Sequence, residues 1–530
     1  MPPLSTTALL DFLSLTSARR FQVEPIISEF NSLPTDKKSS ARPSTLAKVF
    51  PLVFGDNAVI NGSPLYEEYW TQPWSPSCYL NPTVILTPIT RTQVTQILAL
   101  THFLGATFSI RGGGHLQNPG FNSNDGGIVI AFCKGEFTQL ILSEDKKTVN
   151  IGVGLRWADV YERLDEHGLA VAGGREPRVG VAGLLLGGGL SYQCNEVGVG
   201  CMGVVDYEVV LADSTIVHAN KDENPDLFWA LKGGGPNFGM VINVTMTTLS
   251  NILWSENRLY SASLNTAFLS ALMAYQTLID FDNKASLIYH TVNDRTFVTF
   301  TYSEPAEDGC PGIFMPFQHI PYIRYLVSPA RRTVLEMAKG VANVLESEKL
   351  FHEMRTTTTL PDLEVYQAAE QARLKAIASL ADLDHADLTM VIQPMSPSSV
   401  KAANDRGGNS FGLNCAGHQI FLILADYTNP ANAPRIQAAM RKIIDTVEEV
   451  AKKNGSYLPF KYANYAAPDQ DPLASYGEKN LSRLREIAEK YDPEGVFQVL
   501  QNGGWLVSRA GLRREREQQL DGGHIMKTEI

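Results

Sequence analysis

Clusters of glycine are the feature that most constrains how this chain can fold. Three consecutive glycines precede a histidine in "IRGGGH" (residues 110–115), and further runs occur in "GGREPRVGVAGLLLGGGLS" (173–191) and "LKGGGPNFGMV" (231–241). Ordered glycine costs backbone entropy, so such runs mark places where the backbone turns tightly or approaches another group closely. Backbone N–H groups in these loops can cradle a large anionic ligand such as a pyrophosphate. The competing interpretation is that the glycines only form corners of a small β-rich domain.

Familiar nucleotide and metal motifs are excluded by their context. "GVGCMG" (198–203) matches G-x-G-x-x-G, but the sequence after it indicates two strands around a turn, whereas a dinucleotide motif opens a helix. No G-x-x-x-x-G-K-[ST] loop occurs, and "HEMRT" (352–356) lacks the second histidine of a zincin. The six cysteines form no C-x-x-C pair, which disfavours a zinc site or a dense disulfide framework and favours buried free thiols.

The composition limits the kinds of partner that the protein can bind. A net charge of −11 offers no counter-charge to nucleic acid or to an anionic membrane. No segment approaches the roughly 18 apolar residues of a membrane span. The apolar N-terminal patch is interrupted by Asp11 and follows no basic residue, so no signal peptide is expected. We therefore expect an intracellular, cytoplasmic protein, with secretion left open.

The pattern along the chain predicts an α+β protein of several parts, since 530 residues exceed one core. Short β-rich runs alternate with the glycine clusters, and the later helix at 435–454 has a natural stop at Gly455. The predicted parts are an N-terminal helical segment (1–75), a β-rich domain (76–250), a second domain (251–455), a returning C-terminal segment (456–510) and a charged tail (511–530).

The ordered set of motifs resembles the FAD-linked oxidoreductases of the vanillyl-alcohol oxidase and berberine-bridge-enzyme type, especially the fungal members of secondary metabolism. "IRGGGH" and "NPDLFWALKGGGPNFGMV" carry the resemblance most specifically. It implies a two-lobed α+β fold, in which a PCMH-type FAD-binding domain (76–250) is completed by a berberine-bridge-like segment (456–510). A sheet-and-helix substrate domain (251–455) would cover the flavin; there the resemblance is weakest.

The resemblance also implies how FAD is held. The glycines of "RGGGH" would wrap the diphosphate, and His115 would bond covalently to the 8α carbon of the flavin and raise its reduction potential. Members with two covalent bonds place a cysteine where this chain has Glu176, so we expect a single bond. A small Val179 beside the ring would leave oxygen a path to it. The predicted cofactor contacts are Arg111, Gly112, Gly113, Gly114, His115, Val179, Gly180, Ala182, Gly183, Gly187, Gly188, Gly189 and Val241.

The catalytic base is predicted in "KYANYAAPD" (461–469), which fits the family's Y-x-N-Y strand. Tyr462 and Tyr465 are the candidates. Because alternate residues of a strand face opposite ways, only one of them would point at the flavin. Either could instead be an ordinary strand aromatic. His418 is a weaker candidate, better interpreted as a core or surface histidine.

The resulting functional prediction is an FAD-dependent oxidase of a small apolar metabolite. Hydride would pass to flavin N5 while a base takes the companion proton, and molecular oxygen would reoxidise the flavin and yield hydrogen peroxide. A polyketide, terpenoid or alkaloid intermediate is the substrate class that the resemblance implies. The alternatives are a redox-neutral isomerase or cyclase that binds flavin, and a non-catalytic binding protein on the same fold.

Overall fold

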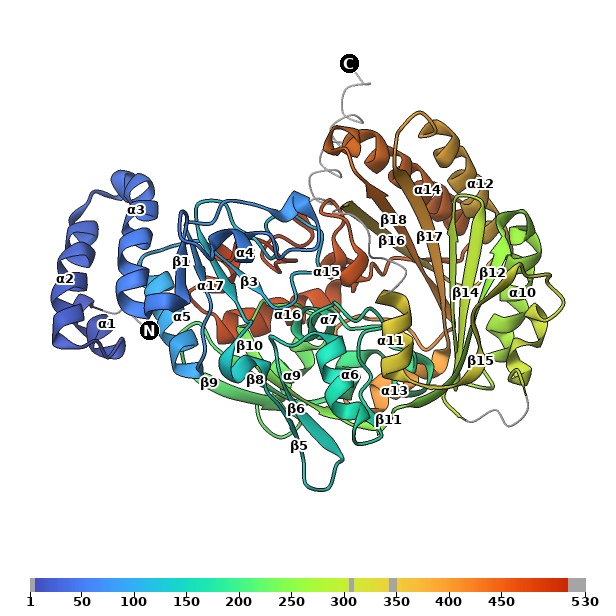
Figure 1. The fold of residues 1–530 in the computed structure, drawn as a ribbon, viewed down its shortest axis with the longest axis horizontal. Coiled ribbons are helices and arrows are strands. Elements are labelled where there is room, and N and C mark those ends of the chain that lie inside the picture. Colours follow the sequence, from blue (N-terminus) through green and yellow to red (C-terminus); the bar gives the residue numbers. More distant parts are fainter. Residues whose placement is uncertain (1–4, 305–308, 343–349, 513–530) are drawn as a thin grey trace, which may run out of the picture.

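The computed structural model describes residues 5–304, 309–342 and 350–512, so nearly all of the predicted charged tail lies outside the described residues. Two lobes lie side by side (Figure 1). The first contains a four-stranded, a five-stranded and a two-stranded sheet, and the second contains one eight-stranded sheet with helices packed on it. The predicted α+β fold is confirmed.

Three helices form a bundle at one end of the molecule (Figure 1). They are α1 (Thr6–Phe12), α2 (Ser17–Ser32) and α3 (Thr35–Phe54). The Ser5 and Thr16 side chains accept hydrogen bonds from the first turns of α1 and α2, which satisfies amides that a helix N-terminus leaves unpaired. Phe50 of α3 is fully buried in the core of the first lobe, so the bundle is anchored to it.

The first lobe is built from a four-stranded and a five-stranded sheet. In spatial order these are β1 (Ala58–Ile60), β2 (Val84–Leu86), β4 (Ile128–Ala131) and β3 (Phe108–Arg111), and then β5 (Leu140–Leu142), β6 (Thr148–Gly152), β10 (Met240–Thr247), β8 (Val204–Val210) and β9 (Ile216–Asn220). Strands β2, β4 and β3 run parallel and the five-stranded sheet is antiparallel. β4 reads "IVIA" and is buried throughout, as expected for a parallel strand covered on both faces.

Short elements connect and cover these sheets. They are α4 (Tyr66–Trp70), α5 (Arg91–Phe103), α6 (Trp157–Asp165), β7 (Leu169–Ala170), α7 (Val181–Leu186), α8 (Cys194–Val197), α9 (Pro225–Leu231) and β11 (Leu249–Ser250). Residues 200–203 form a 3-10 turn that leads into strand β8, with no helix after it. The rejection of a dinucleotide motif at 198–203 is therefore confirmed.

The second lobe is an eight-stranded antiparallel sheet with helices on its outer face (Figure 1). In spatial order its strands are β15 (Arg324–Thr333), β12 (Ile252–Ser261), β14 (Arg295–Tyr302), β13 (Ala285–Val292), β17 (Ala386–Met395), β18 (His418–Tyr427), β16 (Phe351–Thr359) and β19 (Tyr457–Leu458). Its helices are α10 (Asn265–Leu278), α11 (Val334–Ala342), α12 (Leu363–Ser379), α13 (Pro397–Asp405) and α14 (Ala433–Asn454). As predicted, α14 ends at Gly455, which adopts a left-handed conformation.

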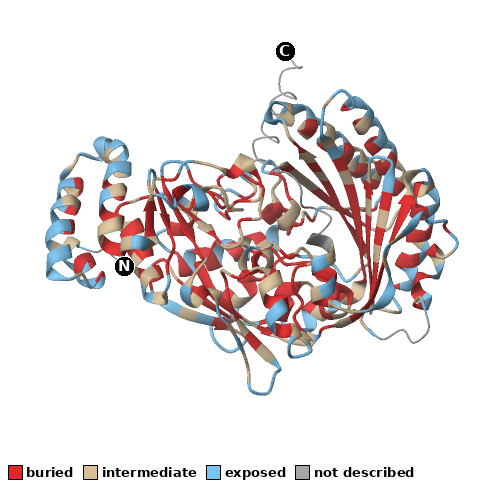
Figure 2. Cartoon of the chain, in the orientation of Figure 1, coloured by how far each residue is buried: buried red, intermediate tan, exposed pale blue. Residues whose placement is uncertain are grey.

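Side chains of the large sheet alternate between two cores. Ile392 and Ile423 pack under the outer helices, whereas Val391, Ile420 and Leu422 join the core of the first lobe. The central strands are consequently buried on both faces (Figure 2). The inner face of β13, β17, β18 and β16 is therefore the surface that this lobe presents to the glycine loops.

The C-terminal segment crosses from the second lobe back to the first. Its helices are α15 (Pro472–Ser475), α16 (Glu478–Tyr491) and α17 (Val496–Val499). Beyond them the chain pairs beside β3, where the Phe108 amide donates to the Leu500 carbonyl at 2.8 Å and the Asn502 amide donates to the Phe108 carbonyl at 2.7 Å. The strand predicted around Tyr462 and Tyr465 is wrong, because residues 463–465 form a 3-10 turn.

Within the described residues no cluster of metal-ligating side chains occurs. All six cysteines are free. Cys78, Cys194 and Cys201 are buried as expected, whereas Cys415 is exposed. No helix in the described ranges is long and apolar enough to cross a bilayer.

Candidate active site

Two of the glycine clusters pack backbone against backbone. The loop after β3 lies against the turn that precedes α7. A Cβ atom added to Gly113 would lie 2.3 Å from the Gly180 amide nitrogen, and one added to Gly180 would lie 2.2 Å from the Gly113 amide nitrogen. No side chain fits at either position, so both must be glycine. Two sequence motifs whose facing glycines, Gly113 and Gly180, are 67 residues apart thus form one site.

Arg111 fixes the start of the first loop. Its Nε donates to the Asn122 carbonyl at 2.8 Å and its Nη1 to the Tyr69 carbonyl at 2.6 Å. Burial lowers the pKa of Arg111 to about 10, so the guanidinium stays charged at neutral pH. These contacts hold the loop in place from its buried side, and the next turn is completed by Gly114 at a φ of +68°.

His115 belongs to a stack of three rings that spans both lobes. Its imidazole lies 4.3 Å from the Trp74 ring at an interplanar angle of 16°, and Trp74 in turn lies 3.6 Å from the His352 ring at 10°. His352 comes from β16 and its Nδ1 pairs with Asp426 of β18 at 2.6 Å. The large sheet therefore helps to fix the orientation of His115.

The electrostatic setting keeps His115 neutral. Burial of the ring, followed by the charges of Arg156 and Arg178, lowers the pKa of His115 to about 3. Its Nε2 atom is buried and has no hydrogen-bond partner in the described part of the chain. An uncharged imidazole with an unsatisfied buried nitrogen fits a site completed by a ligand.

Glu176, where a cysteine is expected in members with two covalent bonds, lies in the turn that precedes α7. Its carboxylate accepts a hydrogen bond from Arg178 Nε at 2.8 Å. Cys194 lies beyond this turn, where its sulfur accepts a hydrogen bond from the Ser191 amide at 2.9 Å. The structure thus places an ion pair, and no cysteine, at this position.

The run Gly187–Gly189 packs against the protein's own side chains. Added Cβ atoms would lie 2.1 Å from Asn464 Oδ1 at Gly187, 2.5 Å from Phe411 Cζ at Gly188 and 2.4 Å from Leu184 Cδ2 at Gly189. Packing against these side chains therefore accounts for the three glycines, independently of any contact that their backbone would make with a cofactor.

The other predicted cofactor residues differ in exposure. Gly183 is exposed, and a Cβ there would meet nothing within 4 Å. Val179, Gly112 and Ala182 are half-buried. Val241 of β10 pairs with Val209 of β8, and the side chain of Val241 belongs to the core of the first lobe. Only the main chain of Val241 is therefore free to contribute to a cofactor site.

Tyr462 is a buried structural phenol. Its hydroxyl oxygen accepts hydrogen bonds from the Gly189 amide at 2.9 Å and from Asn464 Nδ2 at 3.0 Å. Burial raises the pKa of Tyr462 well above its ordinary value. The phenol therefore stays protonated at neutral pH and ties Gly187–Gly189 to the C-terminal segment.

Tyr465 lies beside Tyr462, with ring centroids 4.9 Å apart and an interplanar angle of 86°, but its hydroxyl meets different partners. Arg175 Nη2 donates to it at 3.2 Å and Gln393 Nε2 at 3.5 Å, while Arg175 also donates to Gln393 Oε1. Two N–H donors, one of them cationic, thus converge on one phenol oxygen. The Tyr465 hydroxyl is thereby held between the second glycine motif and β17.

Several residues of this site were not predicted from the sequence. Arg175 comes from the second glycine motif and Gln393 from β17, where it is the single polar residue in the buried run "MVIQPM". That isolated polar residue is the signal that could have found it. His290 of β13 also lies near Arg175, and its buried Nδ1 has no partner among the described residues. Trp74 and His352 carried no comparable signal.

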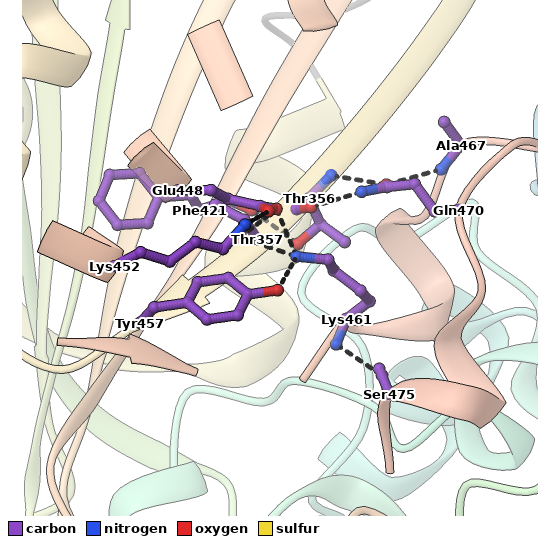
Figure 3. A network of polar contacts seen from close by, with 10 residues as sticks. All are labelled: Thr356, Thr357, Phe421, Glu448, Lys452, Tyr457, Lys461, Ala467, Gln470 and Ser475. Carbon is purple, nitrogen blue, oxygen red and sulfur yellow. Dashed lines mark hydrogen bonds and ion pairs between the residues drawn. The ribbon is translucent and has the colours of Figure 1, made fainter. Parts of the chain in front are cut away.

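A polar network clamps the tyrosine turn onto the large sheet (Figure 3). Lys461 Nζ donates to Glu448 of α14 at 2.5 Å and to Thr357 of β16 at 3.0 Å. Gln470 completes the clamp, since its side chain donates to the Thr356 carbonyl at 2.7 Å and accepts from the Thr356 amide at 3.1 Å. The residues on both sides of Tyr462 and Tyr465 are thereby fixed to the sheet.

The Lys461–Glu448 pair gives a stability prediction. Burial alone would raise the pKa of Glu448, but the charge and hydrogen bond of Lys461 outweigh it, and the net pKa is lowered. Lys461→Met leaves this mostly buried carboxylate with only the more exposed Lys452 ammonium, 3.3 Å away, so we expect the free energy of unfolding at pH 7 to fall by about 2 kcal/mol. Because the pKa of Glu448 is lower in the folded state, it stabilises the fold at pH values above its unfolded-state pKa of about 4.3, and this stabilisation is lost as the pH falls. The difference in the free energy of unfolding between Lys461→Met and wild type should therefore shrink towards pH 3.

Chemical denaturation across this pH range measures the effect. Lys453→Met is the matched control, because Lys453 pairs with Glu364 on the surface with 75% of its side chain exposed. We expect that variant to change stability by less than about 1 kcal/mol. Equal losses in the two variants would contradict a buried clamp.

Comparison with known proteins identifies the family. A model described as "FAD binding domain" matches residues 82–220, and one described as "Berberine and berberine like" matches residues 461–502. An FAD-dependent monooxygenase of Arthrobotrys oligospora is 33% identical over 515 residues, which cover 94% of this chain and 98% of that protein. The FAD-dependent monooxygenase yanF of Aspergillus niger is 33% identical over 505 residues, which cover 93% of this chain and 85% of that protein.

Solved structures share the fold. Glucooligosaccharide oxidase of Acremonium strictum, which is described with a 6-S-cysteinyl, 8α-N1-histidyl FAD, aligns with a TM-score of 0.68 and 20% identity over 81% of this chain and 94% of that chain. The grass pollen allergen Phl p 4, described as having glucose dehydrogenase activity, aligns with a TM-score of 0.68 and 17% identity over 84% of this chain and 95% of that chain. The full-length relatives, the FAD-binding match over the glycine loops and the berberine-like match over the tyrosine turn together place this chain in the berberine-bridge-enzyme-like family of FAD-linked oxidoreductases.

Proposed function

We propose that this chain is an oxygen-dependent FAD oxidase of a small, largely apolar metabolite of secondary metabolism, with Tyr465 as its general base. The observation that carries the proposal is the convergence of Arg175 and Gln393 on the Tyr465 hydroxyl, next to the glycine loops. Bound FAD would supply the hydride acceptor and pass the electrons to oxygen, which yields hydrogen peroxide.

The loops at 111–115 and 179–183 would hold the cofactor, and His115 would carry its single covalent bond. A neutral ring with an unpaired buried nitrogen supports this role, because only an unprotonated imidazole is nucleophilic. Glu176, paired with Arg178, supports one attachment point in place of the two described for glucooligosaccharide oxidase.

The two tyrosines would have different roles. Tyr465 would act as a phenolate, accept the proton from a substrate O–H or C–H while the hydride leaves, and become a neutral phenol, and Arg175 would stabilise the phenolate before the transfer. Tyr462 keeps its proton and positions the Gly189 amide. Positioning of Tyr465 depends on the clamp around Lys461.

Val179 gives a prediction about oxygen. Phl p 4 is described with glucose dehydrogenase activity and a single isoleucine-to-valine variant of it as a glucose oxidase, so one aliphatic side chain separates the two activities on this fold. Val179 is half-buried beside Gly180 in the loop that would hold the flavin. We expect Val179→Ile to slow reoxidation of the reduced flavin about tenfold, a barrier change of about 1.4 kcal/mol.

Stopped-flow absorbance of the reduced enzyme mixed with aerated buffer measures that rate. Val205→Ile is the control, because Val205 is 40% exposed and lies in β8, outside the loops that would hold the flavin. Unchanged reoxidation in Val179→Ile would contradict a role of Val179 in oxygen access.

An oxygen electrode coupled to peroxide detection, repeated with ¹⁸O₂, tests the proposed reaction. An oxidase consumes one oxygen per product, releases peroxide and incorporates no label. Label in the product would instead establish the monooxygenase reaction after which the sequence relatives are named. Product formed without oxygen uptake would establish the redox-neutral alternative, and a colourless protein would refute the enzyme proposal.

A further inference from the structure

A cavity of about 210 Å³ is lined by Tyr462, and neither Arg175 nor Tyr465 is among its lining residues. It is bounded by the ends of β17 and β18, by α13 and by the loop that follows α13. Tyr462 and Leu190 form the wall towards Gly187–Gly189, and Phe411 and Leu413 come from the loop. Nothing in the proposed proton transfer at Tyr465 uses this space.

The lining has an uncharged chemistry. Aliphatic and aromatic side chains make up most of it, and its polar members are serine, asparagine, histidine and tyrosine, with no aspartate, glutamate, lysine or arginine among the lining residues. A charged ligand would lose its hydration there without a counter-charge. The composition therefore selects against carboxylates, phosphates and ammonium groups.

His418 supplies the directional contact. Its side chain lines the cavity from the first residue of β18, and the residue is only 2% exposed. Its Nδ1 lies 3.1 Å from the Ala416 carbonyl oxygen, which can only accept, so Nδ1 carries the hydrogen. Burial lowers the pKa of His418, in agreement with a neutral ring. Its Nε2 is then a lone-pair acceptor, and no hydrogen bond to it is formed within the described ranges.

The volume limits the size of the occupant. An apolar protein cavity of about 150 Å³ is enough to hold benzene. The present cavity is larger, so one ring or two fused rings would fill it.

From this geometry we infer that the cavity binds an uncharged, largely apolar molecule of one or two fused rings, whose hydroxyl or N–H group donates to His418 Nε2. The occupant is a second ligand and not the oxidised substrate, because neither Tyr465 nor Arg175 lines the cavity. Tyr462 connects the two places, since its ring lines the cavity and packs edge-on against Tyr465.

Equilibrium dialysis of the purified flavoprotein with three probes tests the inference. We expect 2-naphthol to bind about fivefold more tightly than naphthalene, the increment of one net hydrogen bond, and 2-naphthoate not to bind detectably. In His418→Phe, which keeps a ring and removes the acceptor, 2-naphthol and naphthalene should bind equally. Binding of 2-naphthoate as tight as that of 2-naphthol, or an unchanged preference in His418→Phe, would overturn the inference.

Substitutions that fill the cavity provide an independent test of the inference. Leu413→Trp places an indole in the cavity from a half-buried loop and should abolish binding of both neutral probes, with Ala403→Trp as a second variant. Val499→Trp is the control, because Val499 is 69% exposed outside the cavity. Full probe binding in Leu413→Trp with its flavin retained would refute the site. Flavin content and oxygen uptake are measured separately, so a protein without oxidase activity that still binds 2-naphthol would refute the proposed function alone.

Discussion

Replacement of His115 by alanine is expected to release all of the flavin when the protein is precipitated with acid. In the wild type the flavin should stay in the pellet, because the proposed bond to His115 is covalent and survives unfolding. The physical basis is the neutral ring, whose pKa of about 3 leaves it unprotonated throughout the physiological range, and its unsatisfied buried nitrogen. Absorbance of the supernatant and mass spectrometry of the pellet give the measurement.

His167→Ala is the matched control, since His167 is exposed on the turn after α6, and it should retain the flavin in the pellet. Loss of the link should also lower the reduction potential of bound flavin by on the order of 30 mV, a tenfold change for a two-electron couple. Flavin found in the supernatant of the wild type would contradict the covalent proposal. Flavin retained in the pellet of His115→Ala would show that the flavin is attached to another residue.

The sequence predicted the fold class because its strongest signals are local. Glycine at 113 and at 180 is required by a close approach of two backbones, and that requirement is visible as a glycine run even before the partner loop is known. Gly455 after an amphipathic stretch likewise marked the end of α14. Signals of this kind depend on a few neighbouring residues.

The site depends on contacts between segments that are distant in the sequence. These contacts could not be predicted from the sequence. Gln393 meets Arg175 only because β17 presents its inner face to the second glycine motif. The 3-10 turn at 463–465 replaces the expected strand because Lys461 and Gln470 fasten its two ends to the large sheet. The tyrosines consequently pack together, one buried against Gly189 and one against Arg175, in place of the predicted arrangement on opposite faces of a strand.

Conversion of Tyr465 to phenylalanine is expected to reduce the rate of flavin reduction by substrate about 10²- to 10⁴-fold, the usual contribution of a general base. Removing only the hydroxyl leaves Arg175 and Gln393 bonded to each other, so the flavin content should not change. Anaerobic stopped-flow reduction, with a substrate found by oxygen uptake, measures the rate.

Tyr462→Phe is the matched variant, because it removes the neighbouring hydroxyl of the same turn. Its loss leaves the Gly189 amide without the acceptor that it has in the structure, so we expect a loss of about 1–3 kcal/mol in stability. The rate of flavin reduction should be retained, since Tyr462 is held as a neutral phenol by its burial. If Tyr462→Phe slowed flavin reduction and Tyr465→Phe left it unchanged, the assignment of the two roles would be reversed. Because both hydroxyls lie within one short turn, the contrast separates proton transfer from the support of the glycine loop.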